Sequence, residues 1–127
     1  MNYLSPEQNL FLHARLVEET GGSHGLRDIN LLLSALGRPQ ATFDSEELYP
    51  DVFSKAAALV DSLIRDHPFL DANKETGVAS AGLFLILNGY YLTASNPELE
   101  SFALAIAQSL ESIEEIAEWM RDHSLSV

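Results

Sequence analysis

The feature that most constrains the fold is an apolar stretch from Gly77 to Leu87, interrupted only by Ser80. A helix that is apolar all round is buried, because no side of it gains from contact with water. The stretch is too short to cross a bilayer, which takes about 20 residues. We therefore expect a central buried helix over about Asn73 to Asn88, with the rest of the chain packed around it.

Capping signals and apolar periodicity divide the remaining chain into five further helices. The expected capping residues include Ser5, Asp28 and Ser112, and proline often follows at the first helical position. The expected helices begin at Ser5-Pro6-Glu7 and end near Thr20, cover about 29–36 and 51–66, start again at Asn96-Pro97-Glu98, and cover about 113–122. Tyr90 to Leu92 is expected to be a short extended link. The loop from Arg38 to Pro50 has no clear period, with a short helical turn near Ser45 to Leu48 as one option.

No strand-like alternation or repeat is present, so residues 1–127 are expected to form one all-α domain of about six helices. The chain has no cysteine, which suits a reducing cytoplasm. Its start lacks the pattern of a signal peptide, and no stretch can span a membrane. We expect a soluble cytoplasmic protein without membrane contact.

The formal net charge of -12 argues against a nucleic-acid partner, because binding to phosphate backbones needs many cations. The same charge has two interpretations. It can attract a basic segment of a partner protein. It can equally be an ordinary solvated surface.

A polar cluster lies immediately before the central helix, in the sequence His67-Pro68-Phe69-Leu70-Asp71-Ala72-Asn73-Lys74. The N-terminus of a helix offers free N–H groups and a positive dipole end, which favour an anion. Ala72 is small enough for a ligand to approach the backbone, and Asn73 and Lys74 can bind phosphate. Asp71 can hold Mg²⁺ together with phosphate oxygens and water. His67 can take a proton from an attacking hydroxyl. The cluster predicts Mg²⁺-assisted transfer of a phosphate-containing group from a nucleotide to the hydroxyl of a protein or small molecule.

A purely architectural interpretation of the same residues stands beside this one. Asp71 or Asn73 would then be the helix cap, Phe69 a hydrophobic staple, and His67 a loop residue with a satisfied ring. Each residue taken alone is weak evidence for a site, and the residues by themselves leave both interpretations open.

The stretch H-P-F-L-D-A-N-K resembles the H-x-F-x-D-A-N-K-R signature of the death-on-curing toxins, the Doc branch of the Fic superfamily. The general Fic motif has glycine at the position of Lys74. The likeness extends to Gly25-Leu26-Arg27-Asp28, to Arg38-Pro39-Gln40, and to the helix end around Asn88-Gly89. Most of the chain therefore resembles a stand-alone Doc protein, and the fold implied is the single six-helix Fic/Doc domain.

The resemblance implies roles for the individual residues. His67 matches the catalytic base and Asp71 the acid that coordinates Mg²⁺. Asn73 and Lys74, following Ala72, match the residues that bind the phosphates of ATP. Doc toxins are kinases that transfer the γ-phosphate of ATP to a threonine of elongation factor Tu, which stops translation. They are encoded with a Phd-type antitoxin, so a Phd-like partner is implied here.

One departure bears directly on activity: Glu75 occupies the position of the family's arginine. A glutamate beside bound phosphates opposes nucleotide binding, unless it only supports the helix N-terminus from the solvent side. Arg27, Arg38 or Arg65 can be considered as a substitute for the missing arginine. Two alternatives to the kinase therefore remain, namely AMP transfer of the Fic type and a catalytically impaired domain that only binds a partner.

The other histidines are not expected to have a functional role. His13 is expected on the solvated side of the first helix, with Leu10, Ala14 and Val17 forming the apolar stripe. His24 lies in the glycine-rich loop from Gly21 to Arg27, where it is expected to be an ordinary loop residue. The four histidines lack the spacing of a zinc site.

Overall fold

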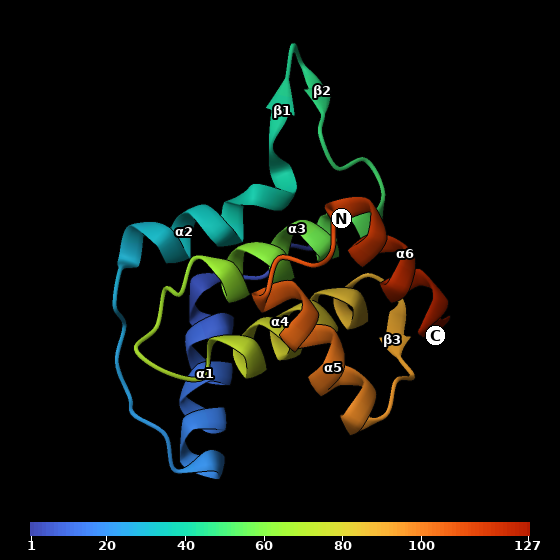
Figure 1. Ribbon diagram of the computed structural model, residues 1–127. Coiled ribbons are helices and arrows are strands. Elements are labelled where there is room, and N and C mark those ends of the chain that lie inside the picture. The colour runs from blue at the N-terminus through green and yellow to red at the C-terminus, as the bar shows by residue number, and fades with distance from the viewer.

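The computed structural model describes all residues from Met1 to Val127. Six α-helices form the body of the protein, as the sequence predicts (Figure 1). They are α1 (Pro6–Thr20), α2 (Ile29–Gly37), α3 (Val52–Arg65), α4 (Asn73–Leu87), α5 (Asn96–Ala107) and α6 (Ile113–Asp122). The smaller elements are η1 (Arg38–Gln40), β1 (Thr42–Phe43), β2 (Glu46–Glu47), β3 (Tyr90–Leu92) and β4 (Ser124–Ser126). None of the helices combines the length and the hydropathy that a membrane-spanning segment needs.

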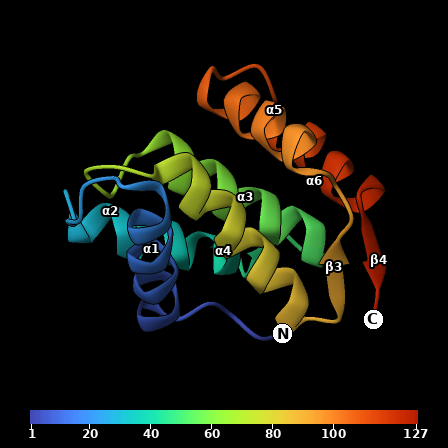
Figure 2. The same cartoon turned by 90° about the horizontal axis from the view of Figure 1, so that it is seen from below.

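The most buried helix is α3, which corrects the prediction that α4 would hold this place. Every residue of α3 from Lys55 to Ile64 is buried. It packs against α4, α6 and α5 and also touches α2 (Figure 2). In α4 only one side is buried, and Lys74, Glu75 and Ile86 are exposed. The prediction was wrong because the polar residues of α3 indicated a surface helix. Lys55 and Asp61 are in fact buried and paired with Glu47 and Arg38.

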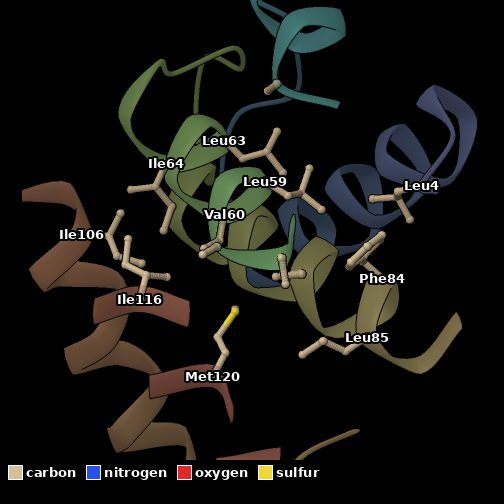
Figure 3. Packing of buried hydrophobic residues seen from close by; sticks show 14 of the residues in the cluster. Leu4, Leu59, Val60, Leu63, Ile64, Phe84, Leu85, Ile106, Ile116 and Met120 are labelled. Atoms are coloured by element: carbon tan, nitrogen blue, oxygen red, sulfur yellow. The ribbon is translucent and has the colours of Figure 1, made fainter. Parts of the chain in front are cut away.

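The hydrophobic core is formed where α3 meets its neighbours (Figure 3). Leu59, Val60 and Leu63 of α3 lie at its centre. Phe84 and Leu85 of α4 approach from one side. The C-terminal helices α5 and α6 close the other side with three fully buried side chains, Ile106, Ile116 and Met120. This core holds the C-terminus of α3 and the N-terminus of α4, and the loop between them carries the polar cluster.

Side-chain caps fix the starts of five helices, mostly at the predicted residues. The capping residues are Ser5 for α1, Asp28 for α2, Asp51 for α3, Ser95 for α5 and Ser112 for α6. For α5 the prediction was one residue late, because Asn96 already has helical geometry and the hydroxyl of Ser95 accepts from the N–H of Glu98. Caps are readable from sequence because they involve only residues within one helical turn.

The segment between α2 and α3 is not a helical turn at Ser45 to Leu48 but a β-hairpin that projects from the body (Figure 1). Thr42 pairs with Glu47 and Phe43 with Glu46. The turn residues Asp44 and Ser45 both have positive φ, at 51° and 65°. Two-residue hairpin turns usually contain Asn-Gly or Asp-Gly. The Asp-Ser pair of this turn lacks that pattern, so the sequence did not indicate a hairpin.

A buried lysine holds the base of the hairpin. Lys55 of α3 is only 1% exposed, and its Nζ lies 2.7 Å from the Oε1 of Glu47. The same Nζ donates to the carbonyl oxygen of Pro39 at 3.0 Å. A charged group can be buried at moderate cost only when it is paired in this way. The hairpin is therefore tied to the central helix by a residue that carries a charge.

The extended link predicted at Tyr90 to Leu92 is confirmed as β3. Its partner is β4 near the C-terminus, with Tyr91 opposite Leu125 (Figure 2). The two strands join the end of α4 to the end of α6. This pairing was not foreseen, because strands of three residues are too short to show alternation.

Candidate active site

The loop between α3 and α4 has strained backbone at both ends. His67 has a φ of 50° and Ala72 a φ of 61°, in the left-handed region that side chains other than glycine rarely adopt. Each such residue costs about 1 kcal/mol or more and persists only where its surroundings hold it. Other residues of the protein must therefore hold His67 and Ala72 in these conformations.

Asn73 closes the loop from within. Its Oδ1 accepts from the N–H of Phe69 at 3.0 Å, and its Nδ2 donates to the carbonyl oxygen of the same residue at 3.0 Å. Phe69 itself is 2% exposed and packs in the core. Both polar atoms of the Asn73 amide are thus engaged by the loop backbone. This gives Asn73 a structural task, whereas its predicted contact with a phosphate stays a prediction.

Among the six α-helices, α4 is the only one whose start has no side-chain cap. Ala72 is the capping residue and offers no polar side chain. The N–H groups of Asn73, Lys74 and Glu75 consequently have no acceptor in the chain. Neither Asp71 nor Asn73 caps this helix, contrary to the architectural interpretation. The free N–H groups and the dipole of a 15-residue helix form an anion-binding end.

Asp71 presents an exposed carboxylate beside this helix end. Its Oδ2 accepts from the N–H of Ser23 at 3.0 Å, and its Oδ1 from the N–H of Ala72 at 2.8 Å. The hydrogen bond from Ser23, followed by that from Ala72, lowers the pKa of Asp71, so the group is ionised at neutral pH.

Mg²⁺ fits this carboxylate when the ion arrives with phosphates. Each oxygen of Asp71 keeps a free lone pair beyond its hydrogen bond. The chain has no group of three or more acidic or histidine side chains that could hold a metal by themselves. Mg²⁺ accepts one or two carboxylates and completes its shell with phosphate oxygens and water, so one aspartate is a sufficient protein ligand.

His67 is exposed at the start of the loop, and its ring is oriented by the backbone. Nδ1 lies 3.0 Å from the carbonyl oxygen of Arg65. A carbonyl oxygen can only accept, so Nδ1 carries the proton of the neutral ring. Nε2 is then the atom with a free lone pair. A ring held in this tautomer can accept a proton from a hydroxyl.

The glycine-rich loop from Gly21 to Arg27 supports the site, a contribution that sequence reasoning missed. Figures 1 and 2 show it at the same end of the molecule as the α3–α4 loop. The N–H of Arg27 donates to the carbonyl oxygen of Pro68 at 2.7 Å, and the N–H of Leu70 to that of Gly25 at 3.1 Å. A Cβ on Gly22 would meet the Oδ2 of Asp71 at 2.7 Å, so a side chain at this position would displace the Asp71 carboxylate.

His13 is a second residue that the sequence analysis misjudged. It is 4% exposed, and its Nε2 lies 3.0 Å from the carbonyl oxygen of Asp71. The predicted apolar stripe of α1 is also only partly right, because Leu10 and the adjacent Phe11 are exposed. The residues of α1 that are buried are Asn9, His13 and Val17. Hydrophobic periodicity could not reveal a face whose buried residues are mostly polar.

The arginines considered as substitutes at the phosphate site differ in their availability. The guanidinium of Arg27 donates to the carbonyl oxygens of His67 and Asp66. Arg38 is paired with Asp61 at 2.9 Å and also bonds Ser62. Only Arg65 keeps most of its donors, since its nearest acid lies 3.7 Å away and its side chain is half exposed. Glu75 is exposed at the helix start.

Comparison with known proteins decides the family. The Fic/DOC family model matches residues 3–85, which include the whole site. The chain is a member of the Fic/DOC family. It is 35% identical over 121 residues to the protein named Protein kinase doc of Escherichia phage P1, covering 95% of this chain and 94% of that protein. It is 47% identical over 74 residues to a protein of Mycolicibacterium smegmatis named Toxin Doc.

The mycobacterial match covers 58% of this chain and 57% of that relative. The match to the phage protein spans nearly the full length of both. Together they identify the chain as a Doc-type protein, and the all-α domain expected from the resemblance is confirmed. Toxin is the role that one of the two relatives carries in its name, and kinase is the role named in the other.

Proposed function

We propose that this Doc protein is the toxin of a toxin–antitoxin pair and acts as a protein kinase. It would transfer the γ-phosphate of ATP to a serine or threonine hydroxyl of a translation factor. The observation that carries the proposal is the juxtaposition, on one loop, of a base-competent His67 with an uncapped helix N-terminus. Neither feature has a structural purpose that the rest of the fold explains.

The chain's residues would divide the reaction as follows. Nε2 of His67 takes the proton of the attacking hydroxyl, and the oxygen of that hydroxyl forms a bond to the γ-phosphorus. The bond from this phosphorus to the β–γ bridging oxygen breaks, so that ADP leaves with the electron pair. The free N–H groups of α4 and the ammonium of Lys74 bind the phosphates and stabilise the charge that develops.

Asp71, with its lowered pKa and free lone pairs, is the residue that would hold Mg²⁺. When bound, the ion neutralises charge on the phosphate oxygens during transfer. Ala72 has no polar side chain, and it leaves the helix start open for a ligand. Asn73 keeps the loop closed around Phe69, so its support of phosphate binding would be through the loop rather than through a free amide.

Two observations weigh on the alternatives. Lys74 in place of the Fic glycine, together with the kinase name of the phage relative, favours phosphate transfer over AMP transfer. The exposed Glu75 beside the open helix start favours the other alternative, a domain with impaired catalysis that only binds a partner. Glu75→Arg is expected to raise the affinity for Mg·ATP if the site is a weakened kinase. Unchanged affinity in calorimetry would refute that explanation.

The partners follow from the same proposal. Elongation factor Tu is the proposed protein target, by resemblance to the Doc toxins. A Phd-like antitoxin is the proposed inhibitor, and a basic segment of it would be complementary to the net charge of -12.

The experiment uses ATP labelled in turn at the γ and α phosphates. Purified protein and Mg²⁺ are added to a bacterial extract, with His67→Asn as control. Asparagine is chosen because it tolerates the positive φ at this position better than alanine does. Label from the γ position on one translation factor, lost in the control, supports the kinase. Label from the α position indicates AMP transfer, and no label from either position contradicts both enzymes.

A further inference from the structure

We propose that His13 is a positioning residue of the active-site loop, which fixes the peptide of Asp71 and thereby the open start of α4. Its effect on phosphate transfer rests on the function proposed above. Its effect on the loop does not, and the two can be measured separately. Nothing in the family signature includes this residue, which lies on α1, 58 positions before Asp71.

The protonation of His13 follows from its partner. Nε2 lies 3.0 Å from the carbonyl oxygen of Asp71, and that oxygen can only accept a hydrogen bond. Nε2 therefore carries a proton. The ring also stacks on Phe69, with centroids 3.7 Å apart and planes inclined by 9°. One side chain thus touches the loop twice, at the aromatic ring of Phe69 and at Asp71, the residue before the helix cap Ala72.

The face of α1 that carries His13 is built to reach the site. Asn9, one turn earlier, is fully buried, and its Nδ2 donates to the hydroxyl of Ser80 in α4 at 2.9 Å. This bond sets the position of α1 along α4. His13 then arrives at the N-terminal end of the same helix, under Asp71. A polar contact between buried helices has a strong preference for one geometry, because a misplaced partner leaves a buried polar group unsatisfied.

Asp71 is consequently held at both its backbone and its side chain. His13 donates to the carbonyl, while the N–H groups of Ser23 and Ala72 donate to the carboxylate. The following residue, Ala72, has the strained φ of 61°. The carbonyl of Asp71 belongs to the peptide that begins this turn. Without the bond from His13 that peptide keeps only the hydrogen bond from the N–H of Ala72 to the Asp71 carboxylate, and the N–H groups of α4 are held less firmly in their direction.

If His13 only fills space in the core, its aromatic ring is sufficient. If His13 positions the loop, the N–H donor at Nε2 is needed as well. Two variants separate these roles. His13→Phe keeps an aromatic ring against Phe69 and removes the donor. His13→Gln removes the ring and keeps an N–H donor at a similar reach from the backbone. A structural role predicts that function follows stability in both variants. The positioning role predicts that the two properties separate.

The first measurement is amide hydrogen exchange of the loop segment, followed at the hydrogen-bonded N–H groups of Phe69, Leu70 and Ala72, together with thermal unfolding. We expect His13→Phe to keep most of its thermal stability but to exchange this segment about tenfold faster, the effect of one lost hydrogen bond. His13→Gln should exchange the segment at nearly the wild-type rate, even if its melting temperature is lower. Equal exchange in His13→Phe and the wild type would overturn the proposal. An ¹⁵N NMR spectrum of the wild type in which Nε2 of His13 carries no proton would also overturn the proposal.

The second measurement is the affinity for Mg·ATP by calorimetry and the kcat and KM of phosphate transfer. His13→Phe should bind Mg·ATP about tenfold more weakly and transfer phosphate more slowly, and His13→Gln should restore both. If His13→Phe matches the wild type in exchange and kinetics, the positioning role fails while the kinase stands. If the wild type neither binds nor transfers, but the exchange pattern holds, the proposed function fails and the positioning role stands.

Discussion

Arg27 provides the sharpest test of how the active-site loop is held. Its Nε donates to the carbonyl oxygen of His67 at 2.6 Å, and its Nη2 to that of Asp66 at 2.7 Å. These are the carbonyls that precede and follow the strained turn into the loop, where His67 has a φ of 50°. The planar fork of a guanidinium suits two neighbouring acceptors, which a lysine ammonium cannot span in the same way. Arg27→Met should therefore release the start of the loop.

The expected loss can be worked out from these two bonds. A hydrogen bond from a charged donor contributes about 1.5 to 3 kcal/mol when shielded from water, and a typical one about 0.5 to 1.5 kcal/mol. Arg27 is exposed, so the lower range applies, and both bonds together give about 1 to 2 kcal/mol. For a domain of this size that lowers the melting temperature by about 3 to 8 °C. Arg27→Lys should lose about half as much, because it can still bond one carbonyl.

The assay pairs urea unfolding with amide exchange of residues 66–70. Arg15→Met is the matched control, because Arg15 is also an exposed arginine but makes only a distant contact, 6.0 Å from the ring of Phe11. The control should change stability by less than about 0.5 kcal/mol. Arg27→Met should lose more and exchange the segment faster. If both variants lose the same stability and exchange is unchanged, Arg27 is not a clamp of this loop.

Three further predictions concern the surroundings of the site. Gly22→Ala should destabilise the fold by about 1 kcal/mol and weaken Mg·ATP binding, because its Cβ would meet the carboxylate of Asp71 at 2.7 Å, whereas Gly37→Ala, with open space around its Cβ, should not destabilise it in urea titrations. The folded-state pKa of Asp71 is lowered from 3.8, so its contribution to stability is present above that pH and is lost as the pH falls through the folded value. Asp71→Asn should therefore show a shallower acid loss of stability than the wild type, and identical acid profiles would contradict the pKa shift. Glu47→Ala should cost about 1 to 2 kcal/mol, since it leaves the buried ammonium of Lys55 without its acid, while Lys55→Met should cost less in the same urea assay because it removes the buried charge as well. A larger loss in Lys55→Met would show that the ion pair stabilises the hairpin base beyond the cost of burying it.

Much of the helical framework was predictable, because helix starts depend on neighbouring residues. Ser5, Asp28 and Ser112 each cap a helix within one turn of the chain, and the sequence identifies all three. The hairpin was not predictable, since Asp44-Ser45 lacks the usual turn residues. The place of α3 at the centre was missed for another reason. Lys55 and Asp61 look like surface residues until their partners, Glu47 and Arg38, are seen.

The candidate site also has a part that the sequence predicts and a part that only the structure shows. His67, Asp71 and Lys74 lie on one loop and one helix start, so their proximity follows from the chain itself. The family resemblance rests on this continuity, and the comparisons confirm the family. What the sequence did not reveal is the support behind these residues, which comes from α1 and the glycine-rich loop.

The sequence by itself therefore determined the helices, most of their caps and the order of the reactive groups, because these depend on energies that act over one turn. The tertiary structure alone decided which helix is central and which residues hold the loop. His13, Ser23 and Arg27 reach it across separations of 58, 48 and 40 positions. Their polar atoms gain from burial or bonding only once a distant backbone group is in place. Such a gain leaves no period or motif in the sequence, since it depends on where the chain returns in space.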